Sequence, residues 1–524
     1  MNDEIENMKR IAFVTLLALC STLMAAQVKL RTASIGIRMI DSTKVEAPYL
    51  TFGRTVYAMH GRPQVDYLLL MFREKPWDTD KWEPQGEIAL LSLPDHQLLW
   101  TRPFNYQKQA VSLSRWGVLL LEGNNVSLLD KQTGETVWKQ KMSLVKFDDT
   151  SRVVIGYKSN ASSKLIGYDI LTGKQMWTVK LPHNENWGWG DVIRDDSTHL
   201  LVTCNNLSRL NLLTGELQVH EAKTGVTDVK NALLQGLVAV AGAIGTAALT
   251  GGMYSYYPLY VGQNMITGLY SNVVKDDSVY FFSDRKHVAC LDSTLNTIWQ
   301  TELPAKTATH ASLLVDDSLV YMFSYGYGVA ASGPKKMGRP FIAAFDKRTG
   351  KELFMNLLTM KKDIVSNALL TPSGVYMMFD DGLAYQSDLR DPQTDISPWD
   401  FEQYGRLHGL RAEPFYVHYP LKGTFQRVEF DGQNCPVITD KGYVYLVNEH
   451  LEIRDRFDYY HLYYPIYEQD DRIWVSGPKD DLWVLHELGI PEYHITQPIE
   501  KICYYGEHLY LQDEKGVYIV EQLP

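Results

Sequence analysis

The sequence lacks the short motifs by which common metal-binding and hydrolytic sites are recognised. It has no CxxC pair, no CxxCH haem-attachment motif and no two adjacent cysteines, so cysteine-based sites of these kinds are excluded. It also has no GxSxG nucleophile elbow and no HExxH zinc motif, which excludes two easily recognised classes of hydrolase. The five cysteines are scattered along the chain, at Cys20, Cys204, Cys290, Cys435 and Cys503.

The last four cysteines stand among strand-like apolar residues, as in LLVTCNN and HVACLD. Such thiols behave as small apolar side chains, so we expect them to be buried. One or two disulfides stay open, because an exported chain can form them and spacing alone does not assign the pairs.

Charge is also sparse. Charged residues make up 22% of the chain, the net charge is -11, and no long run of Lys and Arg occurs. Broad nucleic-acid binding is therefore not expected, because the phosphate backbone requires a cationic surface. The hydrophobic fraction of 45% is typical of an ordered globular chain. Its 524 residues suffice for several domains or one large repeat architecture.

The N-terminus resembles a bacterial secretory signal. In MKRIAFVTLLALCSTLMAAQ (8–27), Lys9 and Arg10 precede an uncharged stretch that ends in small residues. We expect residues 1–26 to form a signal peptide that is cleaved near Ala26. The alternative is an uncleaved membrane anchor, although the apolar run is shorter than the roughly 20 residues of a typical span.

Lipid attachment at Cys20 is not expected. A lipoprotein signal places a small residue before its cysteine, whereas Leu19 is bulky and apolar residues continue beyond Cys20. The sequence therefore predicts an exported protein that is periplasmic or associated with the cell envelope, in a Gram-negative bacterium.

A short internal repeat dominates the rest of the chain. Its best copy is YDILTGKQMW (168–177), and related segments share the spacing of its aspartate, glycine and tryptophan. The first, fifth and ninth residues of the copies are Asp130, Gly134 and Trp138; Asp169, Gly173 and Trp177; Asp346, Gly350 and Phe354; Asn211, Gly215 and Val219; Ser92, His96 and Trp100; and, in a copy shortened by one residue, Asp292, Asn296 and Trp299.

The substitutions among the copies follow turn chemistry. The first position is Asp, Asn or Ser, whose side chains hydrogen-bond to the backbone of a following turn. The fifth is Gly, Asn or His, residues that adopt positive φ more readily than most. The ninth is mostly a large apolar residue on the outgoing strand. Each copy therefore predicts two strands joined by a tight turn.

The spacing of the copies predicts a β-propeller. Alternating or apolar segments rich in β-branched residues precede each turn, as in GVLLLEGNNVSLLD. Trp100, Trp138 and Trp177 are 38 and 39 residues apart, close to the roughly 40 residues of a four-stranded blade. We expect an all-β fold: a single propeller of seven or eight four-stranded blades over residues 27–524, with clear repeats at 88–360 and weaker ones at 360–524. The last strands should complete a blade begun near the N-terminus.

Two segments depart from the repeat. The first is 223–270, in which the run 231–253 has no charged residue. We expect this run to form a short apolar, helical insertion packed on the propeller. The alternatives are a surface that contacts a membrane or a partner, and a transmembrane span. A single crossing would divide a closed propeller, which argues against the span. The segment 390–430 is expected to be a long ordered connection.

The spacing of aspartate, Thr-Gly and tryptophan resembles the repeat of the pyrroloquinoline-quinone-like β-propellers. This family includes quinoprotein alcohol dehydrogenases and the propeller subunit of the outer-membrane β-barrel assembly machinery. The resemblance implies that the recurrent large residue packs between neighbouring blades, a role carried over to Trp100, Trp138, Trp177, Trp299 and Phe354. One superfold hosts many roles, so the resemblance is more specific for fold than for function.

The resemblance also raises the question of a quinone cofactor. The dehydrogenases typically hold the quinone between a tryptophan and a disulfide of adjacent cysteines, with a calcium ion nearby. This chain has no adjacent cysteines, so we expect neither pyrroloquinoline quinone nor calcium and no catalytic residue. A quinone-dependent dehydrogenase remains the second alternative.

The function expected from the sequence is a non-catalytic scaffold that binds another envelope protein, with outer-membrane protein assembly as the nearest analogy. The first alternative is a carbohydrate-binding or carbohydrate-active propeller, because aromatic residues in two loops could contact sugar rings. The speculative ligand surface consists of His183, Trp187, Trp189 and Tyr463. The structural alternative is that these aromatic residues fill the interfaces between blades.

Overall fold

The computed structural model of the chain describes residues 28–77, 79–159, 162–181, 189–204, 206–227, 265–305, 307, 310–330, 332–358, 364–371, 374–389, 396–469, 471–486 and 488–520. Several expectations lie outside the described residues: the signal peptide 1–26 with Cys20, the apolar run 231–253, and the loop residues His183 and Trp187.

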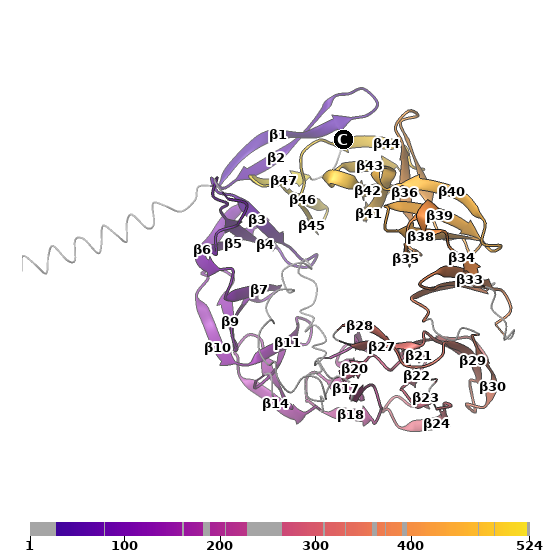
Figure 1. The fold of residues 1–524 in the computed structure, drawn as a ribbon. Coiled ribbons are helices and arrows are strands. Elements are labelled where there is room, and N and C mark those ends of the chain that lie inside the picture. Colours follow the sequence, from indigo (N-terminus) through magenta and orange to yellow (C-terminus); the bar gives the residue numbers. More distant parts are fainter. Residues whose placement is uncertain are drawn as a thin grey trace, which may run out of the picture.

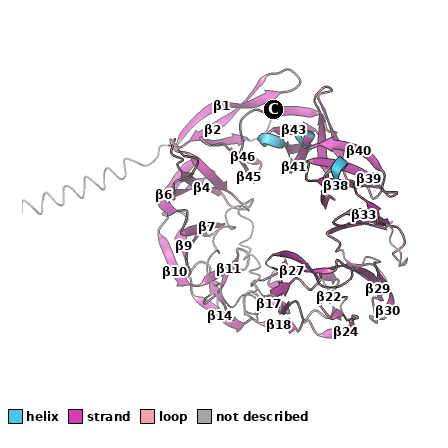
Figure 2. Cartoon of the chain, viewed as in Figure 1, coloured by secondary structure: helices cyan, strands magenta, loops and turns pink. Residues whose placement is uncertain are grey.

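The described residues form an all-β fold, as the sequence predicts. Strands make up nearly all of the regular structure in Figure 2. The helical segments of the described residues are the single turn α3 (Phe401–Tyr404) and the 3-10 turns η1 (Tyr459–His461) and η2 (Pro478–Asp480).

Most sheets consist of four consecutive antiparallel strands and follow one another around a ring (Figure 1). The first five of this kind contain β3 (Val56–His60), β4 (Tyr67–Arg73), β5 (Gln85–Ser92) and β6 (Gln97–Asn105); β7 (Gln109–Ser114), β8 (Gly117–Glu122), β9 (Asn125–Asp130) and β10 (Thr136–Lys141); β11 (Ser143–Asp148), β12 (Val153–Tyr157), β13 (Lys164–Asp169) and β14 (Gln175–Lys180); β15 (Val192–Arg194), β16 (His199–Thr203), β17 (Leu207–Asn211) and β18 (Leu217–His220); and β21 (Val274–Asp276), β22 (Val279–Ser283), β23 (His287–Leu291) and β24 (Thr297–Glu302).

Three further four-stranded sheets follow; the second has consecutive strands, and the other two have strands of other sheets inserted in their sequence. They are formed by β25 (Ala311–Val315), β26 (Leu319–Ser324), β29 (Phe341–Asp346) and β30 (Glu352–Leu357); by β31 (Asn367–Thr371), β32 (Gly374–Met378), β33 (Gly382–Gln386) and β34 (Ser397–Pro398); and by β35 (Leu407–Leu410), β38 (Asn434–Thr439), β39 (Tyr443–Asn448) and β40 (Ile453–Asp458).

The two ends of the described chain meet in one eleven-stranded sheet. Its order is β37 (Thr424–Val428), β36 (Phe415–Tyr419), β41 (Leu462–Gln469), β42 (Arg472–Ser476), β43 (Leu482–His486), β44 (Pro491–Ile495), β1 (Lys29–Arg38), β2 (Lys44–Thr51), β47 (Gly516–Val520), β46 (His508–Gln512) and β45 (Lys501–Tyr505). Tyr49 pairs with Tyr518 and Leu50 with Val517. The last strands therefore join N-terminal ones, as the sequence predicts.

The number of blades stays a prediction. The eleven-stranded sheet joins strands that a propeller divides among neighbouring blades. A further four-stranded sheet, made of β19 (Val226–Thr227), β20 (Met265–Thr267), β27 (Tyr327–Ala330) and β28 (Gly333–Lys336), is assembled from two insertions rather than from four consecutive strands. Sheet order alone therefore does not count blades in this chain.

The hydrophobic core lies between successive sheets. One buried cluster joins Leu119 and Leu128, from β8 and β9, to Val154 and Ile166, from the following sheet. Burying one such side chain stabilises the fold by about 1.5–3 kcal/mol. Each sheet is thus stabilised mainly by its neighbours around the ring.

The two departures from the repeat have defined structure at their described parts. Val226 of β19 pairs with Ile266 of β20, so the described residues on the two sides of the apolar run lie side by side. The segment 390–430 is expected to be a long ordered connection, and its described part, 396–430, contains β34, α3, β35, β36 and β37. The strands of this segment are short, and charged residues and prolines between them make its apolar pattern hard to recognise in the sequence.

Candidate functional site: inter-sheet joints and exposed loops

The turn of each clear repeat is held by its first residue. Asp169 Oδ1 accepts hydrogen bonds from the N–H groups of Thr172 (2.8 Å) and Leu171 (3.1 Å) and from the Thr172 hydroxyl (2.9 Å). Partial burial of the carboxylate acts to raise its pKa, but these hydrogen bonds and Arg152 outweigh that effect and lower the pKa. Asp130, Asp346 and Asn211 accept the corresponding hydrogen bonds in their turns. The fifth residues Gly134, Gly173, Gly215 and Gly350 all have positive φ, between 64° and 73°.

The tryptophan of each copy docks on the turn of a neighbouring sheet. The Trp138 indole donates a hydrogen bond to the carbonyl of Ile170 (2.8 Å), and a Cβ added to Gly173 would lie 2.5 Å from Cγ of Trp138. The glycine therefore provides both the positive φ and the space for the indole. The same relationship joins Trp100 to Gly134, Trp177 to Gly215 and Trp299 to Gly350, and these indoles donate to the carbonyls of Lys131 (3.2 Å), Leu212 (2.8 Å) and Lys347 (2.9 Å).

In four of the joints a second hydrogen bond comes from the residue two positions after the large aromatic one; after Trp177 that position is Val179. Gln140 Nε2 donates to the carbonyl of Gly173 (2.9 Å), and Arg102 and Thr301 donate to the carbonyls of Gly134 and Gly350. Asn356 follows Phe354 at the same distance along the chain and donates to the carbonyl of Leu389 (2.7 Å). Phe354 itself packs against the cluster that contains Val375, so it takes the position of the tryptophan.

The structure adds one joint that the sequence did not indicate. Trp399 is buried, its indole donates to the carbonyl of Gly405 (2.8 Å), and Gly405 has φ 87°. Trp399 belongs to the cluster with Val437 and Tyr445 of the following sheet. The turn that follows Trp399 includes α3 and does not have the Asp-x-x-Thr-Gly spacing. The pair of Trp399 and Gly405 in the sequence was nevertheless a signal from which this joint could have been predicted.

The shortened copy differs from its predicted geometry. The residue with positive φ is Leu295 (65°), not Asn296, because the turn is one residue shorter and its fourth residue takes the left-handed conformation. Leu295 is buried in a cluster with Leu201 and Leu207 of the preceding sheet. The preceding sheet has Val219 at the ninth position instead of a tryptophan. At this joint the large apolar side chain is therefore Leu295, which comes from the turn.

A buried charge network also links these two sheets. The fully buried Asp195 carboxylate accepts hydrogen bonds from Arg209 (2.6 Å), Lys275 (2.7 Å) and Tyr280 (2.8 Å). Arg209 lies on β17, whereas Lys275 and Tyr280 lie on β21 and β22. Burial acts to raise the pKa of Asp195, and the three hydrogen bonds outweigh it and lower the pKa. Polar contacts thus join the sheets where the docking tryptophan is missing.

The first copy is the least regular. His96 has φ 53°, as expected for the fifth position. The Ser92 hydroxyl donates to the Asp95 carboxylate (2.9 Å), instead of accepting from the turn backbone. The turn nevertheless precedes Trp100, which is buried.

The described members of the speculative ligand surface lie in the core. Trp189 is 4% exposed, and its indole donates to the Tyr157 hydroxyl (2.9 Å). Tyr463 is also 4% exposed, and its hydroxyl donates to the Asp481 carboxylate. These two rings follow the structural alternative, in which the aromatic residues fill the core, because each is buried with its polar atom already paired.

One tryptophan is almost completely exposed. Trp77 lies on the loop between β4 and β5 and is 97% exposed. At the base of this loop the Arg73 guanidinium lies 5.1 Å from the ring centre of Tyr57 and 4.5 Å from that of Tyr106, and it donates to the carbonyl of Trp82 (3.3 Å). A supported loop that presents a bare indole is a feature of protein-binding surfaces, where tryptophan is often an energetic anchor.

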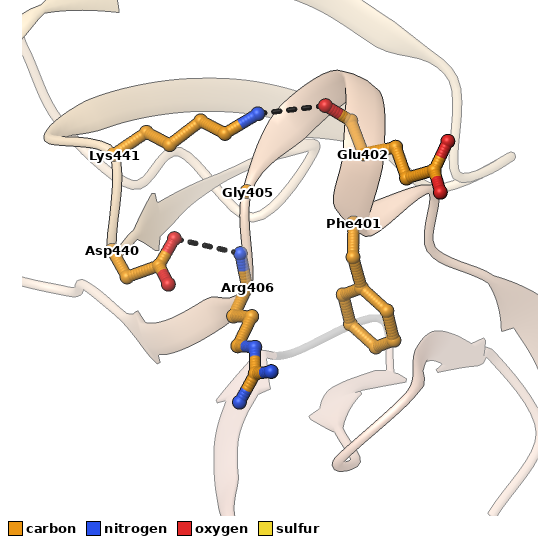
Figure 3. Close-up of a pocket in the computed structure, with 6 residues that line it drawn as sticks. All are labelled: Phe401, Glu402, Gly405, Arg406, Asp440 and Lys441. Carbon is orange, nitrogen blue, oxygen red and sulfur yellow. Dashed lines mark hydrogen bonds between the residues drawn. The ribbon is translucent and has the colours of Figure 1, made fainter.

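A shallow cavity of about 330 Å³ lies beside α3 (Figure 3). Its lining residues are Phe401, Glu402, Gly405, Arg406, Asp440 and Lys441. The Lys441 ammonium donates to the carbonyl of Glu402 (2.7 Å), and the Asp440 carboxylate accepts from the N–H of Arg406 (2.8 Å). These contacts fix the turn that receives Trp399.

The residues present do not fit a quinone site of the dehydrogenase type. The four described cysteines are buried, free thiols at separate places in the fold, so no pair of adjacent cysteines can cover a quinone. Within the described residues, no three His, Cys, Asp or Glu side chains are grouped so as to hold a metal ion. None of the helical turns in this part of the chain has the length and hydropathy that crossing a bilayer requires.

Comparison with known proteins supports the relationship suggested by the repeat. A family model described as outer membrane protein assembly factor BamB matches residues 122–256. The resemblance to the pyrroloquinoline-quinone-like propeller family is confirmed. The chain matches no curated protein.

The fold is similar to several solved structures at low sequence identity. The crystal structure of BamB from Moraxella catarrhalis is 13% identical, with 87% of this chain and 99% of that chain covered and a TM-score of 0.32. A eukaryotic initiation factor is 9% identical, with 77% and 89% covered and a TM-score of 0.38. Hsv2 from Kluyveromyces lactis is 7% identical, with 67% and 98% covered and a TM-score of 0.29.

Proposed function

We propose that this chain is an exported, non-catalytic β-propeller that serves as a protein-binding scaffold in the bacterial cell envelope and takes part in outer-membrane protein assembly. The observation that carries the proposal is the match of the BamB family model to residues 122–256. The secretory pattern at the N-terminus supports export. No cofactor or metal is part of the proposed function.

The use of the repeat residues supports a scaffold. The aspartates, glycines and tryptophans that give the family resemblance hold turns and join sheets, as in the contact of Trp138 with Gly173. Such joints make a rigid ring, and binding residues are then presented on its loops. Trp77, on the loop that Arg73 supports, is the exposed anchor to which we assign partner contact.

Site-specific photo-crosslinking tests this function. A photoreactive amino acid replaces Trp77 in the full chain, expressed in a Gram-negative host, and the same residue replaces the exposed Lys164 of β13 as a matched control. We expect discrete adducts with an envelope protein from position 77 and none from position 164. Recovery of the protein from the cytoplasm, or identical adduct patterns at both positions, contradicts the proposal.

The apolar run 231–253 is the second element of this proposal, as a surface that contacts the membrane. Its lack of charged residues supports contact with an apolar phase. Flotation of the full chain with lipid vesicles, compared with a variant lacking 231–253, measures this contact. Equal flotation of the two proteins contradicts it. If the variant no longer floats but still co-purifies with the partner found by crosslinking, the deletion has removed membrane contact and not partner binding.

A further inference from the structure

The first half of β1 has one edge without a neighbouring strand. Residues Lys29 to Ser34 pair with Thr51 to Glu46 of β2. On its other side, β1 pairs with β44 only through Gly36, Ile37 and Arg38. Among the described residues, no strand pairs with the outer edge of 29–34. Figure 1 shows β1 along the outer boundary of the ring.

The outer strands of most regular sheets carry a bulge, whereas 29–34 is an uninterrupted stretch of six residues; the four residues of β18 also have no bulge. In β6, β10, β14, β24 and β30 the ladder skips one residue next to the large aromatic residue, at Leu99, Val137, Met176, Ile298 and Leu353 respectively. Such bulges twist an edge and prevent it from pairing with another chain. The longest remaining stretch, in β6, contains Pro103, which has no N–H to donate. The six residues of 29–34 contain no bulge and no proline, and the bulge of β1 follows them at Ile35, between Ser34 and Gly36.

The charge of this edge is opposite to that of the whole chain. Lys29 and Arg31 lie two residues apart, so their side chains lie on the same face of the strand. Lys29, Leu30, Arg31 and Thr32 are all exposed, while the chain carries a net charge of -11. An added strand with acidic residues at alternate positions would place its carboxylates beside these two cations, and such cross-strand pairs are stabilising.

Charge does not favour a second copy of this chain at the edge. Antiparallel pairing of 29–34 with itself would place Lys29 opposite Ser34 and Arg31 opposite Thr32. Such a pair would bring no carboxylate to the two cations, whereas opposite charges on neighbouring strands stabilise pairing. The occupant favoured by charge is therefore a different, acidic chain.

We propose that residues 29–34 of β1 accept an extended acidic segment of a partner protein as an additional strand. This inference rests on the proposed scaffold function and specifies the kind of partner. Backbone hydrogen bonds along the open edge would provide affinity, and Lys29 and Arg31 would select acidic residues at alternate positions.

The probe is a fluorescent ten-residue peptide of alternating glutamate and threonine, compared with a peptide in which lysine replaces glutamate. Binding to the full chain is measured by fluorescence anisotropy, and the site is located by hydrogen–deuterium exchange. The variant Lys29→Glu/Arg31→Glu removes the cations. The matched control Lys139→Glu/Lys141→Glu makes the same change, at the same spacing, on the exposed positions of β10.

We expect the acidic peptide to bind and to slow backbone exchange within 29–34. The Lys29→Glu/Arg31→Glu variant should weaken this binding about tenfold and bind the lysine peptide instead, while the control keeps the preference of the natural chain. Absence of binding, protection at another segment, or equal weakening by the two variants overturns the inference. If the variant still forms the adducts expected at position 77, the scaffold function stands and strand addition alone is wrong.

Discussion

The indole of Trp138, at the outer strand of one sheet, lies directly over the α-carbon of Gly173, in the turn of the next. A Cβ at position 173 would be 2.5 Å from Cγ of the indole, closer than such atoms approach in folded proteins. The glycine is therefore needed for two separate reasons, its φ of 64° and its lack of a side chain. A suitable control separates these reasons.

Gly173→Ala should destabilise the fold more than Gly123→Ala. Both glycines have positive φ, 64° and 56°, so each alanine incurs a conformational cost of about 1–2 kcal/mol. A Cβ at position 123 would meet nothing within 4 Å, whereas at position 173 it displaces the indole, for a total cost of about 3 kcal/mol or more. Urea unfolding of both variants measures the difference, and equal midpoints would show that the indole contact contributes nothing.

Trp138→Ala should be strongly destabilising and Val137→Ala nearly neutral. Trp138 is 7% exposed and hydrogen-bonded, so its removal leaves a cavity at the joint and costs about 3–5 kcal/mol. Val137, the adjacent bulge residue, is 50% exposed, and its truncation should change stability by about 0.5 kcal/mol at most. Thermal unfolding of the two variants checks this contrast. A similar loss for both would place the stabilisation in the strand rather than in the joint.

The repeat could be predicted because its residues act locally. Asp169 and Gly173 satisfy a turn five residues long, so their spacing is visible in the sequence. Leu295 was missed because its role depends on contact with Leu201 and Leu207 of the preceding sheet. The joint at Trp399 was missed because its turn departs from the repeat spacing, although Gly405 follows it by only six residues. The strands between 396 and 430 were also missed, because their short apolar stretches acquire meaning only through pairing with β38 and β41.

The candidate ligand residues failed for a related reason. Aromatic residues such as Trp189 and Tyr463 can either contact a ligand or fill an interface, and composition does not distinguish these uses. Burial depends on the tertiary fold, and it places both rings in the core while leaving Trp77 bare. The loop sequence around Trp77 gave no periodic pattern from which this exposure could be inferred.

Acid should weaken the eleven-stranded sheet through Asp481. Burial acts to raise the pKa of this carboxyl, but hydrogen bonds from His494, Tyr463 and Trp483 outweigh it and lower the pKa to about 2. Because the folded pKa is below the ordinary value of 3.8, this stabilisation is present above about pH 4 and is lost as the pH falls toward about 2. Asp481→Asn should therefore be less stable than the natural chain near neutral pH.

The test is the dependence of the urea midpoint on pH for the natural chain, Asp481→Asn and Asp317→Asn, the last an exposed control on the β25–β26 turn. The difference between the natural chain and Asp481→Asn should shrink between about pH 4 and about pH 2. The Asp317→Asn curve should follow that of the natural chain. A constant difference across this range would show that ionisation of Asp481 does not contribute.

The four described cysteines should be inert in the folded protein. Burial raises the pKa of Cys290 and of Cys503 to about 11, and the thiolate is the reactive form. A chromogenic disulfide reagent at mildly alkaline pH should react slowly with the folded chain and rapidly after unfolding in urea. Four reactive thiols per mature, unreduced chain are expected; two would show a disulfide, and rapid reaction of the folded chain would contradict their burial.

Pyrroloquinoline quinone and calcium should neither bind this protein nor give it dehydrogenase activity. The adjacent-cysteine disulfide that covers the quinone in the dehydrogenases has no counterpart among Cys204, Cys290, Cys435 and Cys503, which are free thiols far apart in the sequence. Purified chain is incubated with the quinone and calcium, dialysed, and examined by quinone absorbance and by dye reduction with alcohols and sugars. Retained quinone or turnover above that of free quinone would contradict the non-catalytic assignment. The absorbance arm matters most, since a chain that binds quinone without a known substrate would still show the cofactor.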